Sequence, residues 1–146
     1  MIKADVHVHS KFSPDSKTEV IFHIEKAIEQ RAHSICITDH YDIIYLYKKN
    51  DAKEKYKREI DILIGVEVGL LSQFKKQINE FLNRYEFDFI IGSSHFVGNI
   101  EPYQSIFWEN RSEKEALRNY FESILENVKI FKNYDVYGHL DYYVPF

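Results

Sequence analysis

Hydrophobic and polar positions along the chain repeat with two different periods. Short, nearly continuous apolar runs predict β-strands, whereas apolar residues three or four positions apart predict amphipathic helices. The strand candidates are residues 2–9, 34–38, 60–66, 87–91 and 135–137, and the helix candidates are residues 20–31, 70–82 and 112–131. Because strands and helices alternate, we expect an α/β fold with a parallel sheet, formed by one domain over residues 1–146.

Polar residues between these segments refine their limits. Ser16 with Glu19, and Ser112 with Glu115, have the spacing of a capping box and predict the starts of two helices. Residues 96–111 are expected to form a loop over one end of the protein. The charge-dense residues 48–59 are expected to form a solvated helix or a surface excursion.

The composition is that of an ordinary globular protein. Apolar residues make up 45% and charged residues 29% of the 146 residues, unlike a disordered chain. The net charge is −4 and basic residues are interspersed with acidic ones, so we expect no nucleic-acid partner. No apolar run approaches the roughly 18 residues of a membrane span, and no membrane association is expected. With Cys36 as the single cysteine, we expect a reducing compartment, the cytoplasm.

The first strand candidate contains the stretch Asp5-Val6-His7-Val8-His9. Residues two apart on a strand share a face. We therefore expect Asp5, His7 and His9 to point to one side, and Val6 and Val8 to point to the other side, into a hydrophobic layer. Imidazole is the commonest protein metal ligand. The stretch indicates a metal site, although by itself it is equally typical of the polar face of an edge strand.

Ligand-type residues lie at the carboxyl end of every strand candidate. They are His7 and His9, then His40, Glu67, His95 and His139. In parallel α/β folds the loops at this end of the sheet converge, and active sites are built there. We expect these residues to form one site, and we interpret the other two histidines, His23 and His33, as surface or helix-end residues.

The types of ligand narrow the choice of metal. Imidazoles and carboxylates without thiolates suit zinc, manganese or iron, and Glu67 can bridge two ions because a carboxylate has two oxygens. The spacing leaves Asp15 open between a metal ligand and a turn residue, and we expect Asp5, Asp39 and Asp141 to orient imidazoles. Two or three such ions would generate hydroxide and bind an anionic tetrahedral group, which favours phosphate-ester hydrolysis.

Five motifs occur in a characteristic order. They are Asp-x-His-x-His at 5–9, Thr-Asp-His at 38–40, Glu-Val-Gly at 67–69, Ser-Ser-His at 93–95 and Gly-His-Leu-Asp at 138–141. In this order they resemble the metal-binding motifs of the polymerase and histidinol phosphatase (PHP) family. Within that family, residues 93–97, the Pro102-Tyr103 loop and residues 136–142 are similar to the histidinol-phosphatase branch.

The resemblance implies a distorted, TIM-like barrel of seven βα units with a trinuclear metal centre. Carried over position by position, it implies that His7, His9 and Glu67 hold one ion, that Glu67, His95 and His139 hold a second, and that Asp15 and His40 hold a third. It also implies a metal-dependent phosphomonoesterase that converts L-histidinol phosphate to L-histidinol and phosphate in histidine biosynthesis. Catalysis would then depend on Glu67, His9 and His40.

The chain departs from the family in its length. At about 30 residues for each βα unit, its 146 residues hold about five units. The family's last metal motif, an Asp-x-His, and an Arg that follows the Gly-His-Leu-Asp motif have no counterpart. We therefore expect an open sheet edge that self-association or a second chain covers. Two alternatives stay open, namely a related phosphoesterase acting on nucleotides or phosphotyrosine, and a catalytically incomplete metal-binding fragment.

Overall fold

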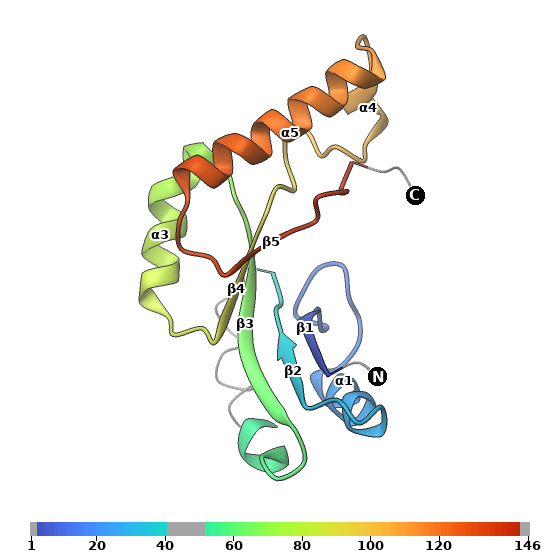
Figure 1. Ribbon diagram of the computed structural model, residues 1–146, viewed down its shortest axis with the longest axis vertical. Coiled ribbons are helices and arrows are strands. Elements are labelled where there is room, and N and C mark those ends of the chain that lie inside the picture. Colours follow the sequence, from blue (N-terminus) through green and yellow to red (C-terminus); the bar gives the residue numbers. More distant parts are fainter. Residues whose placement is uncertain (1–2, 41–51, 144–146) are drawn as a thin grey trace. The chain divides into compact units, whose positions relative to one another are not determined.

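The structure is a computed structural model that describes residues 3–40 and 52–143. Its elements, in chain order, are β1 (Ala4–Val8), α1 (Val20–Glu29), β2 (Ser34–Ile37), β3 (Asp61–Gly69), η2 (Ser72–Phe74), α3 (Lys75–Arg84), β4 (Phe89–Ser93), α4 (Ser105–Trp108), α5 (Glu113–Ile130) and β5 (Val136–Gly138) (Figure 1). Among the described helices, none is long and apolar enough to cross a membrane.

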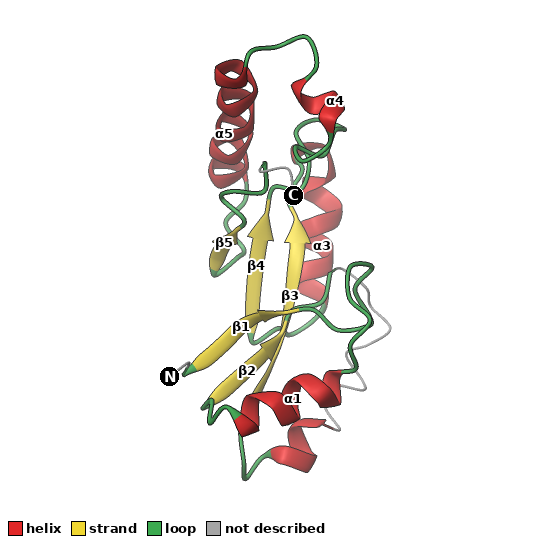
Figure 2. Ribbon diagram, turned by 90° about the vertical axis from the view of Figure 1, so that its right-hand side faces the viewer, coloured by secondary structure: helices red, strands yellow, loops and turns green. Residues whose placement is uncertain are grey.

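The strands pair in the order β1-β2-β3-β4-β5. β1 runs parallel to β2, and β2 runs parallel to β3, as Figure 2 shows. In the second of these pairs the register is regular and sets Ser34 beside Asp61 and Ile35 beside Ile62. Parallel neighbours that are also consecutive in sequence are what the alternation of strands and helices predicts.

The described residues within the ranges 1–68 and 86–91 form one compact unit, here called the N-terminal unit. Its core contains Ile24 and Ala27 from the inner face of α1, together with Ile35 and Ile37 of β2. β3 is buried along most of its length, which explains why its sequence is an almost continuous apolar run rather than an alternating one. A carboxylate near the end of this strand is therefore held in a rigid and dry place.

The described residues within the ranges 69–85 and 92–146 form the second compact unit, the C-terminal unit. Its core contains Phe107 of α4 together with Ala116, Tyr120 and Ile124 of α5. The predicted capping box of α5, the long helix in orange and red in Figure 1, is confirmed. The Oγ of Ser112 accepts a hydrogen bond from the Glu115 N–H at 3.3 Å, and the Glu115 carboxylate accepts one from the Ser112 N–H at 2.8 Å.

Three predicted boundaries are wrong. The Ser16–Glu19 capping box does not form, because α1 begins at Val20 with Glu19 as its N-cap and Ser16 accepts a hydrogen bond from the Thr18 N–H instead. The helix predicted from residue 70 begins at Lys75, after the short η2. The predicted loop over residues 96–111 contains α4.

The predicted burial of Val6 is also wrong. Val8 is 7% exposed, but Val6 is 38% exposed. The register between β1 and β2 is irregular from Asp5 to Val8, so strict alternation of buried and exposed side chains does not hold there. β1 is also an edge strand, because it comes first in the strand order of the sheet. Of the charge-dense residues 48–59, residues 52–56 are helical, and residues 48–51 lie outside the described residues.

Candidate metal centre

Three imidazoles of the N-terminal unit surround one buried carboxylate. Glu67, near the end of β3, is 0% exposed. Its Oε2 atom lies 3.1 Å from Nε2 of His7 and 2.9 Å from Nε2 of His9. Nδ1 of His40 lies 3.5 Å from the same oxygen. The end of β1, the segment after β2 and the end of β3 thus bring these four residues together, as the convergence of parallel strand ends predicts.

Asp15 lies on the outer side of the same cluster. Its Oδ2 atom is 2.9 Å from Nδ1 of His9 and 3.5 Å from Nε2 of His40. Its side chain is 53% exposed, whereas that of His9 is 14% exposed. Each of these two rings therefore lies between a buried carboxylate, Glu67, and a solvent-exposed one, Asp15.

These contacts shift the pKa values of the cluster. Burial by itself would lower the pKa of His9, but hydrogen bonds and charge attraction from Glu67 and Asp15 outweigh it and raise that pKa above 6.5. Burial would raise the pKa of Asp15, but its hydrogen bond to His9 and the charges of His9 and His40 lower it below 3.8. The metal-free cluster therefore favours a charged imidazole between two carboxylates.

The donor set fits a divalent transition metal. His9, His40 and Glu67 each offer one ligand atom, and these atoms lie within 4.8 Å of one another. Two imidazole nitrogens and a carboxylate oxygen form a set that zinc takes in catalytic sites, and no thiolate is needed. Asp15 contacts both imidazoles from the outer side, and its carboxylate offers further oxygen atoms that a metal ion can bind.

Asp39 anchors the loop between β1 and α1. Its carboxylate accepts hydrogen bonds from the N–H of Ser10 at 2.5 Å, from the Oγ of Ser10 at 2.8 Å and from the Oγ of Ser13 at 3.1 Å. The Ser13 hydroxyl in turn accepts a hydrogen bond from the N–H of His40 at 2.8 Å. The two serines, 0% and 3% exposed, hold the backbone on either side of the cluster. Neither is among the site residues predicted from the sequence. Their sequence signal is a turn that carries small polar residues directly beside candidate ligands.

The other two supporting aspartates are exposed. The Asp5 carboxylate accepts a hydrogen bond from the N–H of His7 at 3.3 Å, so it contacts the backbone of that residue. Asp141 is exposed as well. The imidazole-orienting role predicted for Asp5, Asp39 and Asp141 stays a prediction.

The C-terminal unit brings its two candidate ligands together. The rings of His95, after β4, and His139, after β5, have centroids 5.7 Å apart. The ring of Tyr142 packs against both, at 5.0 Å from His95 and 5.5 Å from His139. A side chain added at Gly69 would reach within 3.5 Å of Nδ1 of His95. This aromatic environment restricts the orientations of both imidazoles.

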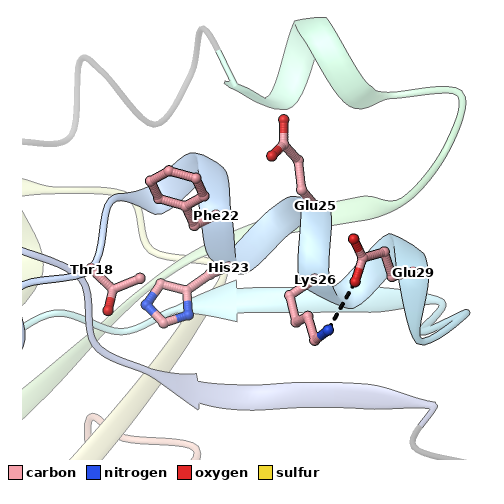
Figure 3. A pocket seen from close by; sticks show the side chains of 6 residues that line it. All are labelled: Thr18, Phe22, His23, Glu25, Lys26 and Glu29. Carbon is pink, nitrogen blue, oxygen red and sulfur yellow. Dashed lines mark hydrogen bonds and ion pairs between the residues drawn. The ribbon is translucent and has the colours of Figure 1, made fainter.

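A pocket on α1 is separate from these ligands. Figure 3 shows its lining residues, Thr18, Phe22, His23, Glu25, Lys26 and Glu29, with Lys26 and Glu29 paired at 2.9 Å. His23 is half-buried in α1, and its Nε2 atom has no hydrogen-bond partner among the described residues. His33 lies between α1 and β2. Neither histidine belongs to the clusters described above.

The match to a family model covers residues 5–146 and identifies the PHP domain. The chain belongs to the PHP domain family. The resemblance predicted from the five motifs is therefore confirmed.

Two histidinol-phosphatases are similar in sequence to this PHP domain. The protein of Lactococcus lactis subsp. lactis is 37% identical over 155 residues, which cover 97% of this chain and 58% of the relative. The protein of Bacillus subtilis is 22% identical over 178 residues, which cover 96% of this chain and 66% of the relative. The chain thus spans less than two thirds of the length of these curated relatives.

Among solved structures, that of a histidinol phosphate phosphatase is similar in fold. The crystal structure of histidinol phosphate phosphatase from Lactococcus lactis, complexed with zinc, L-histidinol and phosphate, matches this PHP domain with a TM-score of 0.91 and 36% identity. The match covers 97% of this chain and 59% of that one. The predicted α/β fold, as part of a TIM-like barrel, is confirmed.

Proposed function

We propose that this PHP domain binds two or three divalent metal ions and supports hydrolysis of L-histidinol phosphate to L-histidinol and phosphate. The observation that carries the proposal is the convergence of His7, His9 and His40 on Glu67, in a chain 37% identical to a histidinol-phosphatase. The similar structure with zinc, L-histidinol and phosphate supports zinc as the metal and a small phosphorylated alcohol as the substrate.

The proposed ligands are His7, His9, Asp15, His40, Glu67, His95 and His139. Glu67 would supply the central carboxylate, because its Oε2 atom already faces three imidazole nitrogens. When bound, divalent ions supply Lewis acidity, which offsets the charge on phosphoryl oxygens and lowers the pKa of water.

The protein's own contribution is to orient and desolvate these groups. Asp15 at 2.9 Å from Nδ1 of His9 favours the tautomer with the proton on Nδ1, which leaves the lone pair of Nε2 directed to the side of Glu67. Complete burial of the Glu67 side chain keeps water away from its carboxylate and strengthens its electrostatic interactions. Catalysis would depend on Glu67, His9 and His40 for this reason.

The experiment measures zinc content per chain and phosphate release from L-histidinol phosphate, with and without added zinc or manganese. The matched control is Glu67→Gln, which keeps the shape of the side chain and removes its charge. We expect at least two ions per chain and phosphate release in the parent, and loss of both in the variant.

Other outcomes would contradict parts of the proposal. Metal binding without phosphate release would reduce the function of these residues to metal binding, as in an incomplete site. Release from a nucleotide or phosphotyrosine but not from L-histidinol phosphate would overturn the substrate. The predicted covering of the sheet edge by self-association or a second chain is checked on the same sample by its mass in solution.

A further inference from the structure

A buried polar network in the C-terminal unit is centred on Asn127 of α5. Its Nδ2 atom donates hydrogen bonds to the carbonyl oxygen of Leu70 at 3.0 Å and to the Oγ of Ser94 at 2.7 Å. Because a carbonyl oxygen only accepts, the Asn127 atom that faces Leu70 must be the amide nitrogen. The Ser94 hydroxyl also hydrogen-bonds the hydroxyl of Tyr137. The network therefore joins the segment after β3, the segment after β4 and β5.

Asn127 and Ser94 are shielded from water, so their polar groups depend on hydrogen bonds within the protein. Asn127 is 3% exposed and Ser94 is 0% exposed. Buried polar groups are unfavourable unless they are hydrogen-bonded. Any displacement of Ser94 from Asn127 would leave polar groups unsatisfied, and the backbone at Ser94 is correspondingly restrained.

A second contact comes from the same face of α5. Tyr120 lies seven residues, or about two turns, before Asn127, which places both on one side of the helix. Its hydroxyl donates a hydrogen bond to the carbonyl oxygen of His139 at 2.5 Å, and its side chain is 0% exposed.

The backbone of His139 needs such a restraint. Its φ angle is +52°, in the left-handed region that a residue with a side chain rarely adopts. Conformations of this kind persist where the surrounding structure holds them. Two hydrogen bonds to its carbonyl oxygen restrain it, one from the Tyr120 hydroxyl and one from the Tyr142 N–H at 3.4 Å.

We propose that Asn127 and Tyr120 are positioning residues that hold His95 and His139 in place for metal binding. Asn127 acts through Ser94, the residue directly before His95, and Tyr120 acts through the His139 carbonyl. The inference rests on the proposed function in one respect, namely that His95 and His139 are ligands. It adds a role for α5, a helix that carries no proposed ligand.

The test measures zinc affinity of the full 146-residue chain by competition with a chromophoric chelator. The variants are Asn127→Leu, which removes the amide, and Tyr120→Phe, which removes one oxygen atom. The control is Ile124→Ala, because Ile124 lies on the same buried face of α5 and packs in the same apolar cluster as Tyr120, but its side chain has no polar atom that could hold the backbone of a ligand. His95→Ala and His139→Ala define how much of the zinc affinity depends on these two ligands, and the unfolding temperature of every variant is recorded.

We expect Asn127→Leu and Tyr120→Phe to weaken zinc binding by about 10- to 100-fold, the usual effect of removing a group that orients a metal ligand. Ile124→Ala should leave zinc affinity within about twofold of the parent, even if its unfolding temperature falls as much as that of Asn127→Leu or Tyr120→Phe. In the His95→Ala background, Asn127→Leu should have no further effect on zinc affinity.

Two results would overturn the positioning role and leave the ligand assignment intact. One is parent-like zinc affinity in both variants while His95→Ala and His139→Ala lose binding, which would leave α5 a purely structural helix. The other is an equal loss in Ile124→Ala, which would show that affinity follows stability alone. If His95→Ala and His139→Ala bind zinc like the parent, the ligand assignment itself is wrong, and the positioning role is rejected with it. Tyr120→Phe keeps the test decisive where Asn127→Leu does not fold.

Discussion

Nε2 of His9 lies 2.9 Å from Oε2 of Glu67, and Nδ1 of the same ring lies 2.9 Å from Oδ2 of Asp15. A fully buried carboxylate such as Glu67 is costly unless it is paired. In the metal-free protein the imidazoles provide that pairing, and the same atoms are the proposed metal ligands. Protons and metal ions therefore compete for His9.

Replacement of Glu67 tests the centre of this arrangement. We expect Glu67→Gln to weaken zinc binding by more than about 100-fold, the upper end of the effect of residues that only orient ligands. The physical reason is the loss of the buried negative charge that faces all three imidazoles of His7, His9 and His40. Chelator competition measures the affinity. Zinc binding equal to that of the parent would remove Glu67 from the ligands.

The titration of His9 in the metal-free protein is a second prediction. Its pKa is raised above 6.5 by Glu67 and Asp15 against the opposing effect of burial, and Asp15→Asn should lower that pKa. A raised pKa means that the interaction stabilises the fold below about pH 6.5 and is lost as the pH rises through the folded-state pKa. NMR titration of the imidazole protons measures it. Asp5→Asn is the control, since the hydrogen bond of the Asp5 carboxylate goes to the backbone N–H of His7 and not to an imidazole. An unchanged pKa of His9 in Asp15→Asn would contradict the prediction.

The contribution of Asp88 to the stability of the fold is predicted to have the opposite pH dependence to that of His9. Burial would raise its pKa, but hydrogen bonds from the Ile64 N–H at 2.7 Å and from Lys53 at 2.5 Å lower it below 3.8. The carboxylate therefore stabilises the fold above about pH 4, and this contribution is lost as the pH falls through the folded-state pKa. We expect Asp88→Asn to lower the free energy of unfolding by about 0.5 kcal/mol at pH 7, because the pair is partly exposed. Denaturant titrations should show this difference vanish near pH 2, and a difference that grows on acidification would contradict the assignment.

Gly65 is required by close packing inside the N-terminal unit. A Cβ atom there would lie 2.6 Å from Cγ2 of Thr38, 2.7 Å from Sγ of Cys36 and 2.8 Å from the carbonyl oxygen of Phe89. We expect Gly65→Ala to lower the free energy of unfolding by about 1–3 kcal/mol, the usual cost of overpacking. Gly69→Ala, in the same strand, is the matched control because its Cβ would meet only His95 at an ordinary 3.5 Å. Equal stability of the two variants would show that the packing at Gly65 relaxes easily.

The predictions that succeeded rest on local or periodic patterns. The apolar run of β3 and the Ser112–Glu115 capping box are visible in the sequence because each depends on residues a few positions apart. The Ser16–Glu19 pair has the same spacing but no capping role, since α1 begins at Val20 with Glu19 as its N-cap. The alternation of Val6 and Val8 failed in the same way, at an irregular register that only the neighbouring strand reveals.

The sequence by itself determined the alternating α/β order, the family and the ligand types at the ends of the strands. These follow from hydrophobic periodicity and from short motifs. Only the tertiary structure decided that His7 contacts Glu67, 60 positions away, that Asp39 accepts hydrogen bonds from Ser10 and Ser13, and that Asn127 hydrogen-bonds Ser94. Such contacts depend on strand register and on which helix face is buried, and neither is encoded in the spacing of neighbouring residues.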